Sequence, residues 1–322
     1  MKVYFGNDAQ PAEKRGIVTV GTFDGVHRGH LAVLAALTEW SSAMGGALAG
    51  VLTFREHPKK TLEGRGPDLV TTLEHRLLLF ERAGVNFTWV LEFVPELAKL
   101  TAREFAQEYF ARRLEIRGLV MGFDSRFGSD RMSKDSPGLQ PLARELNFQV
   151  RNLEQVLSPE GDVISSTKIR EAVWEGRLRD AEAMLGRYVS VYGTVVPGDA
   201  RGRRLGYNTA NLDLGREVRP PFGVYATVAV VDGKQHGSVT NVGYRPTVAQ
   251  NLPPGTKPDL LIETHLFDFH EDLYGKKLEV LFIEKLRDEQ RFPDVTALVE
   301  QIRKDEAKAR AILQAHNSRF QL

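Results

Sequence analysis

The spacing of apolar residues changes near the middle of the chain, and this change constrains the fold more than any other feature. In the first half, short apolar runs alternate with stretches in which apolar residues recur every three or four positions. In the second half, strand-like runs follow one another with glycine-containing turns between them. Alternating strands and helices predict a parallel sheet, whereas successive strands predict an antiparallel barrel or sandwich. We therefore expect two domains of different class.

The first half is predicted to form an α/β doubly wound parallel sheet. The apolar runs that we interpret as strands are 17–21, 47–54, 87–93 and 119–123. The helical patterns between them cover 29–44, 73–83 and 102–114, and a further short helix covers 178–185. The first helix shows its apolar stripe clearly, with Leu31, Leu34, Leu37 and Trp40 at helical spacing.

The second half is predicted to form a small antiparallel β-barrel with a closing helix. Its expected strands are 188–196, 223–231, 236–242, 260–267 and 278–284. The helix follows Pro293 and Asp294, and its expected apolar positions are Val295, Leu298, Val299 and Ile302. We place the boundary between domains 1–186 and 187–322. The polar stretches 129–137 and 249–258 are interpreted as mobile loops.

Composition excludes several classes of protein. Forty-three Lys and Arg residues oppose forty-two Asp and Glu residues, so the chain lacks the basic surplus typical of nucleic-acid binders. The 322 residues include no cysteine, which excludes disulfides and thiolate metal sites. No window approaches the roughly 20 apolar residues of a membrane helix, and the N-terminus lacks a signal-peptide pattern. We expect a cytoplasmic protein without nucleic-acid or membrane partners, and the oligomeric state stays open.

The most informative string is Gly21-Thr-Phe-Asp-Gly-Val-His-Arg-Gly-His30, between the first strand and the first helix of the alternating half. Gly21 and Gly25 allow a tight turn and a close approach of the backbone to a ligand. The free amides and positive end of the following helix favour a polyphosphate. His27 and His30 are three residues apart, so they share one helical face. Two surface histidines, or half of a zinc site without a third ligand, are the alternatives; we favour nucleotide binding.

A second string, Ser165-Ser-Thr-Lys-Ile-Arg170, precedes another helical pattern. Its hydroxyls and cations suit a helix N-terminus that holds phosphate. A plain N-cap explains the same residues, and the position downstream of the first string favours the phosphate site.

A third constellation lies in the barrel half. Thr209 and Asn211 are two apart on an extended segment, so both face one side and can present oxygens to a hard cation such as Mg²⁺. Glu263, on an otherwise apolar strand, is a candidate base for a substrate hydroxyl. Taken singly, the first two residues also fit a turn, and the carboxylate also fits a solvated strand face.

These strings resemble the bifunctional riboflavin kinase/FMN adenylyltransferases, the bacterial FAD synthetases. The resemblance also rests on His57-Pro58, Met121-Gly122-Phe123-Asp124 and Phe127-Gly128 in the first half, and it covers nearly all of 188–313 in the second. It implies that His27 and His30 contact ATP phosphates and serve catalysis. The remaining expected ATP-binding residues are Gly21, Phe23, Gly25, Ser165, Ser166, Thr167 and Arg170.

The same resemblance implies two chemical steps. Asp24, Asp124 and Arg245 are expected in the active sites or against the flavin. Thr209 and Asn211 would ligate Mg-ATP, with Mg²⁺ as the cofactor, and Glu263 would take the proton of the ribityl 5′-hydroxyl. The stretch 198–206 would be a flap over the phosphates. Riboflavin, FMN and ATP are then the substrates, and riboflavin is converted to FMN and FMN to FAD.

Departures from the family pattern leave alternatives. Asn208 stands where proline is usual, so the second hypothesis keeps the adenylyltransferase and treats the barrel as a kinase-impaired flavin-binding module. The third hypothesis is a noncatalytic flavin sensor, and the fourth is a nucleotidyltransferase for another phosphorylated acceptor. Ser125 replaces a typical aromatic, which bears on flavin contacts. The string Arg131-Met-Ser-Lys134 looks like the lysine loop of class I aminoacyl-tRNA synthetases, and we interpret it as a chance match.

Overall fold

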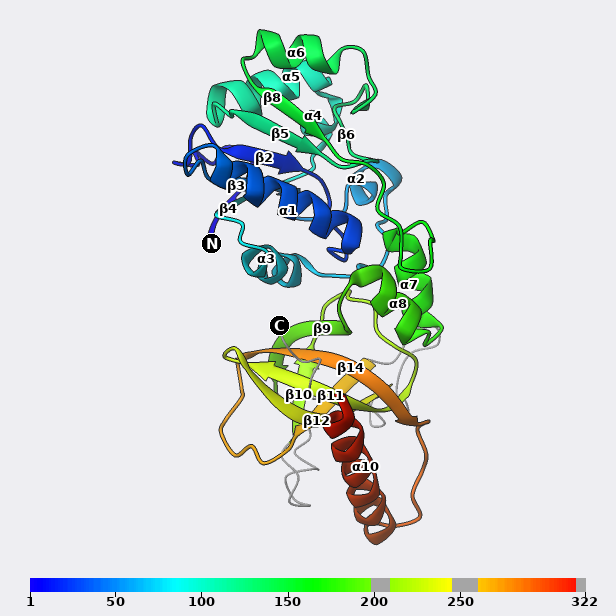
Figure 1. The fold of residues 1–322 in the computed structure, drawn as a ribbon. Coiled ribbons are helices and arrows are strands. Elements are labelled where there is room, and N and C mark those ends of the chain that lie inside the picture. Colours follow the sequence, from blue (N-terminus) through cyan, green and yellow to red (C-terminus); the bar gives the residue numbers. More distant parts are fainter. Residues whose placement is uncertain (198–208, 245–259, 317–322) are drawn as a thin grey trace. The chain divides into compact units, whose positions relative to one another are not determined.

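The computed structural model describes residues 1–197, 209–244 and 260–316, and the chain forms two compact units, Met1–Ser166 and Thr167–Leu322 (Figure 1). This division groups helices α7 (Ser166–Trp174) and α8 (Leu178–Leu185) almost entirely with the second unit. The sequence-based boundary at 186 and 187 assigns both helices to the first domain. It stays a prediction, because compactness does not locate a functional boundary.

The first unit contains a six-stranded sheet in the order β1-β4-β3-β2-β5-β8, and every neighbouring pair is parallel. The strands are β1 Lys2–Phe5, β2 Ile17–Val20, β3 Ala49–Phe54, β4 Phe87–Leu91, β5 Gly118–Met121 and β8 Gln149–Asn152. The helices are α1 Arg28–Ala43, α2 Lys59–Glu63, α3 Leu73–Arg82, α4 Pro95–Lys99, α5 Ala102–Phe105, η1 Ala106–Arg113 and α6 Leu139–Glu145. The predicted doubly wound sheet is confirmed.

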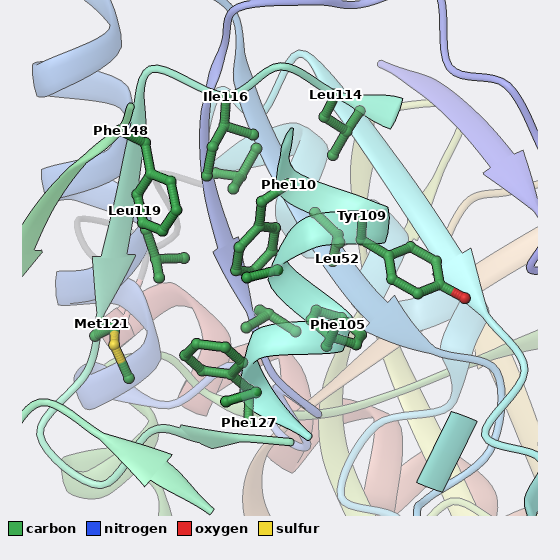
Figure 2. Close-up of a cluster of buried hydrophobic side chains, with 14 of the residues drawn as sticks. Leu52, Phe105, Tyr109, Phe110, Leu114, Ile116, Leu119, Met121, Phe127 and Phe148 are labelled. Atoms are coloured by element: carbon green, nitrogen blue, oxygen red, sulfur yellow. The ribbon is translucent and has the colours of Figure 1, made fainter. Parts of the chain in front are cut away.

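Each face of the sheet carries its own apolar core. The core between the sheet and α1 and α3 contains Ile17, Leu37, Val51 and Phe80. The core on the other face is rich in aromatic rings, and Figure 2 shows Phe105, Phe110, Phe127 and Phe148 converging there. Consecutive strand residues, such as Val51 and Leu52, point to opposite cores, as a strand buried on both faces requires.

The predicted helix 102–114 is not one regular α-helix. Four α-helical residues (α5) lead into the π-helix η1, whose wide turn ends with the amide of Leu114 donating to the carbonyl oxygen of Tyr109 at 3.2 Å. The consecutive residues Tyr109 and Phe110 are both buried. The wider turn therefore lets two adjacent aromatic side chains enter the same core, an arrangement that the helical period of the sequence does not reveal.

The second unit contains a closed barrel in the order β10-β13-β12-β11-β14-β9, which confirms the predicted antiparallel barrel and adds strand β10 to the five expected strands. Its strands are β9 Val189–Val196, β10 Thr209–Asp213, β11 Gly223–Val231, β12 Lys234–Tyr244, β13 Leu260–Leu266 and β14 Lys277–Arg287. Four buried hydroxyl groups are bonded in a row between its strands. Thr227 contacts Ser238 at 2.7 Å and Thr240 at 2.8 Å, and Thr240 contacts Thr264 at 2.9 Å.

Helix α10 (Val295–His316) packs on the barrel with its second half (Figure 1). Its buried residues are Asp305, Ala309 and Leu313, whereas Val295 is 58% exposed. Of the other predicted apolar positions, Leu298, Val299 and Ile302 are half-buried, and Leu298 and Ile302 lie at helical spacing from Asp305, so the predicted face continues into the buried one. Arg287 at the end of β14 forms a bidentate ion pair with Asp305, which fixes the middle of the helix to the barrel.

Candidate active sites

The Gly21–His30 string and the Asp124 string leave the same edge of the parallel sheet. Strand β2 pairs directly with β5, with Thr19 opposite Val120, and the chain reverses its direction of winding between these two strands. The segments that follow them, 21–27 and 122–125, therefore both lie at the carboxyl edge, at the topological switch point. Open α/β sheets bind ligands at this place.

The loop after β2 holds an unusual backbone conformation. Phe23, Gly25 and Val26 all have positive φ angles, of 52°, 86° and 39°. Positive φ is costly for phenylalanine and especially for valine, so the surrounding structure must impose it. The ring of Phe23 is buried and lies edge-on against Phe80, which fixes the loop to the core under α3.

The two histidines of the string stack on each other. Their ring centroids are 3.7 Å apart and the rings are inclined by 15°. His27 is the N-cap of α1, and its Nδ1 accepts a hydrogen bond from the amide of His30 at 3.4 Å. Because Nδ1 accepts, the neutral ring of His27 carries its proton on Nε2, where it can donate to an oxyanion. The structure thus brings together the pair that the three-residue spacing predicts.

Hydrogen bonds to residues 70 and 71, in the segment before α3, hold this loop in place. One carboxylate oxygen of Asp24 accepts from the amides of Val70, at 2.8 Å, and Thr71, at 3.1 Å. The hydroxyl of Thr71 in turn accepts from the amide of Gly25 at 2.8 Å. The predicted site residue Asp24 is 2% exposed, so these contacts give its carboxylate a positioning role. The hydroxyl of Ser166 donates to the carbonyl oxygen of Asp24 at 2.8 Å.

Arg76 is a buried cation that sequence reasoning missed. Its guanidinium donates to the carbonyl oxygen of Thr22, to the hydroxyl of Thr53 at 3.1 Å and to the carbonyl oxygen of Phe54 at 3.0 Å. It therefore joins the ends of β2 and β3. Burial lowers the pKa of Arg76 to about 10, and the charge of Asp24 opposes that shift. On a helical pattern an arginine normally indicates a solvated face, so no signal marked this one.

The remaining predicted residues of the first site are only partly placed. Asp124 is exposed directly after β5, and Gly21 is half-buried after β2. Ser165 precedes α7, whereas Thr167 and the buried Arg170 lie on it and belong to the second unit.

In the barrel, the predicted residues of the second site are neighbours. Asn211 on β10 lies directly opposite Glu263 on β13, and directly opposite residues share a face of the sheet. The hydroxyl of Thr209 donates to a carboxylate oxygen of Glu263 at 2.5 Å. Asn211 is buried and Glu263 is half-buried.

Two further polar residues extend this row, and sequence reasoning assigned neither to the site. Asn241 on β12 lies opposite Glu263 on its other side, and its amide nitrogen donates to Glu289 at 3.4 Å. A Cβ at Gly243 would lie 1.9 Å from the same carboxylate oxygen, so a larger residue there would displace the side chain of Glu289. Arg245, Asn208 and the predicted flap 198–206 lie outside the described residues.

Comparison with known proteins matches both halves. Residues 9–168 match the FAD synthetase family, and residues 185–313 match the riboflavin kinase family (flavokinase). The bifunctional riboflavin kinase/FMN adenylyltransferase of Escherichia coli K12 is 36% identical over 94% of this chain and 95% of its own length. The chain belongs to this family. The relative of the same name from Bacillus subtilis is 33% identical over 92% of both chains.

A solved structure and the family matches extend this comparison to the fold and the activity. A solved structure described as a macrolide-efflux protein from Streptococcus pneumoniae is 30% identical and covers 96% of this chain and 99% of its own, with a TM-score of 0.78. The chain is an ATP-dependent enzyme of flavin biosynthesis that forms FMN from riboflavin and FAD from FMN. The matches support this interpretation and not the kinase-impaired alternative. None of the helices among the described residues is long and apolar enough to cross a membrane.

Proposed function

We propose that FMN adenylylation takes place at the carboxyl edge of β2 and β5, on the stacked histidines. A phosphate oxygen of FMN attacks the α-phosphorus of ATP, the bond from that phosphorus to the bridging oxygen breaks, and pyrophosphate leaves. Nε2–H of His27 and the imidazole of His30 donate to the phosphate oxygens on which negative charge increases. The strained loop 21–27, held by Asp24 and Arg76, keeps these donors in place before the substrates arrive.

We propose that riboflavin phosphorylation takes place on the polar row of the barrel, with Glu263 as the base. The Thr209–Glu263 hydrogen bond is the observation that carries this assignment. Because the hydroxyl of Thr209 donates a hydrogen bond to Glu263, its oxygen lone pairs are directed elsewhere and remain able to bind a cation. The carboxylate keeps a second oxygen for the ribityl 5′-hydroxyl, whose proton it accepts as the hydroxyl oxygen attacks the γ-phosphorus and ADP leaves.

The donor set of the barrel site fits Mg²⁺. Thr209 and Asn211 supply neutral oxygens beside the carboxylate of Glu263, and hard oxygen ligands suit this ion. Among the described residues no group of three or more His, Cys, Asp and Glu side chains is arranged to hold a metal. When bound, Mg²⁺ would neutralise charge on the transferred phosphoryl group.

The test of both assignments uses the purified full-length chain. It is incubated with ATP, MgCl₂ and either riboflavin or FMN, and FMN and FAD are separated by chromatography. We expect both products from riboflavin, and neither when EDTA removes the metal. Formation of FAD from FMN without any FMN from riboflavin would contradict the assignment of the kinase site.

A further inference from the structure

The residue before the N-cap of α1 combines a strained backbone with a buried side chain. Val26 directly precedes the N-cap residue His27, and its φ of 39° lies in the left-handed region. A residue branched at Cβ is an outlier there, because its side chain crowds the backbone. Glycine would hold the same backbone conformation without this cost, so the side chain of Val26 must contribute something that glycine lacks.

The side chain of Val26 ties this strained position to the core. It is 0% exposed and belongs to the apolar core between the sheet and α1 and α3. Leu31, the fourth residue of α1, packs against the same core. An apolar residue before the N-cap and another at the fourth helical position together fix the angle at which a chain enters a helix. The valine therefore sets the direction of the chain at the N-cap.

The backbone around Val26 has little room to relax. The amide of Val26 donates to the carbonyl oxygen of Phe23 at 3.1 Å, and the ring of Phe23 is itself buried. A Cβ at Gly25 would lie 2.9 Å from Cγ1 of Val70, so the loop runs close against the segment before α3. The chain from Phe23 to His27 is thus held at both ends, by a buried ring and by the helix cap.

We propose that Val26 is a positioning residue of the adenylylation site. Its strained backbone directs the chain from Phe23 into α1, so that His27 caps the helix and stacks on His30 with ring centroids 3.7 Å apart. This conformation lowers the stability of the first unit and keeps the imidazole donors in one place. The inference rests on the adenylylation site proposed above.

The first test is the order of stability of two replacements in the full-length chain. Val26→Gly and Val26→Ala both remove the packed side chain, but only glycine relieves the strain. We expect Val26→Gly to unfold at a temperature about 2 to 4 °C above that of Val26→Ala. Val33, which is buried in the same core but lies within α1, is the matched control. There the order should be reversed, because glycine destabilises a helix interior relative to alanine.

The second test is steady-state FAD formation from FMN and ATP by the same preparations. We expect Val26→Gly to lower kcat by about tenfold or more and to change the KM for ATP by less than about threefold, because the histidines act on charge that increases in the transition state. The more stable glycine variant should therefore not be more active than Val26→Ala. Riboflavin phosphorylation should not change in either variant, because the barrel contains its own site.

Three results would overturn the proposal. A Val26→Gly variant less stable than Val26→Ala would show that the backbone is not strained. A wild-type kcat in Val26→Gly would show that catalysis does not need this conformation. Activity that follows stability across the variants would show a purely structural role. The adenylylation site itself is tested separately by His30→Asn: wild-type FAD formation in that variant would contradict the site, and the order of stability at Val26 would still stand.

Discussion

The guanidinium of Arg76 donates a hydrogen bond to the carbonyl oxygen of Thr22, from beneath the loop that carries the stacked histidines. The same group bonds Phe54, so one buried cation fixes the ends of two adjacent strands. Backbone carbonyls that lose a buried partner are costly, and here they belong to the scaffold of a catalytic loop.

Arg76→Leu should therefore destabilise the first unit by about 2 to 4 kcal/mol and slow FAD formation even where the unit stays folded. Arg76→Lys keeps the charge but not the three-way bonding, and it should give a smaller loss. Denaturant unfolding and FAD assays measure these effects, with riboflavin phosphorylation as the internal control. Wild-type stability and activity in Arg76→Leu would exclude the bracing role.

His30→Asn should lower kcat for FAD formation by about 100-fold, the typical effect of removing one donor to a charged transition state. Riboflavin phosphorylation should not change, because the barrel contains its own site. His236→Asn, on β12 of the barrel, is the matched control and should leave FAD formation intact. An equal loss in both reactions would indicate misfolding and not a local role.

Glu263→Gln should lower kcat for riboflavin phosphorylation by at least about 100-fold, because the amide no longer accepts the proton of the substrate hydroxyl. The variant should keep its thermal stability, since the amide oxygen still accepts from Thr209. Glu284→Gln, an exposed carboxylate on β14, is the control. Substantial turnover in Glu263→Gln would show that another group, or none, acts as base.

Acid stability of the first unit should depend on Glu108. The hydrogen bond from Arg113, at 2.6 Å, lowers the pKa of Glu108. A lowered pKa in the folded state gives stability that is present above the unfolded pKa and is lost as pH falls through the folded pKa. Glu108→Gln should therefore melt at a lower temperature than wild type at pH 7, and the difference should disappear toward pH 3. A difference that is independent of pH would contradict this.

The sequence predicted the strands and helices whose side chains repeat with a clear period. The helix 178–185 and the strand 223–231 have the predicted ends. Strands β1 and β8 were missed because they are short edges with mixed burial, and such strands carry no apolar run to find. Their pairing with β4 and β5 depends on the rest of the sheet, which a local pattern does not contain.

Some residues of the candidate sites could likewise be predicted from the sequence and others could not. Residues within one string, such as His27 and His30, were predictable from spacing, and Thr209 with Asn211 from strand alternation. Contributions from distant segments were not: Arg76, Asn241 and Glu289 reach the sites only through tertiary packing. Their residue types gave no signal, because each is common on an exposed surface.

The row of hydroxyls that joins Thr227, Ser238, Thr240 and Thr264 allows the barrel to close in one alignment only. If β12 slipped by one residue against β11, its two hydroxyls would turn to the other face. The buried hydroxyls of Thr227 and Thr264 would then lose these hydrogen-bond partners, which would cost about 1 to 3 kcal/mol of stability each. Loss of these hydrogen bonds therefore makes a misaligned barrel less stable. Thr264, the last hydroxyl of the row, neighbours Glu263 in sequence. The same bonds thus set the register of the strand that carries the proposed kinase base.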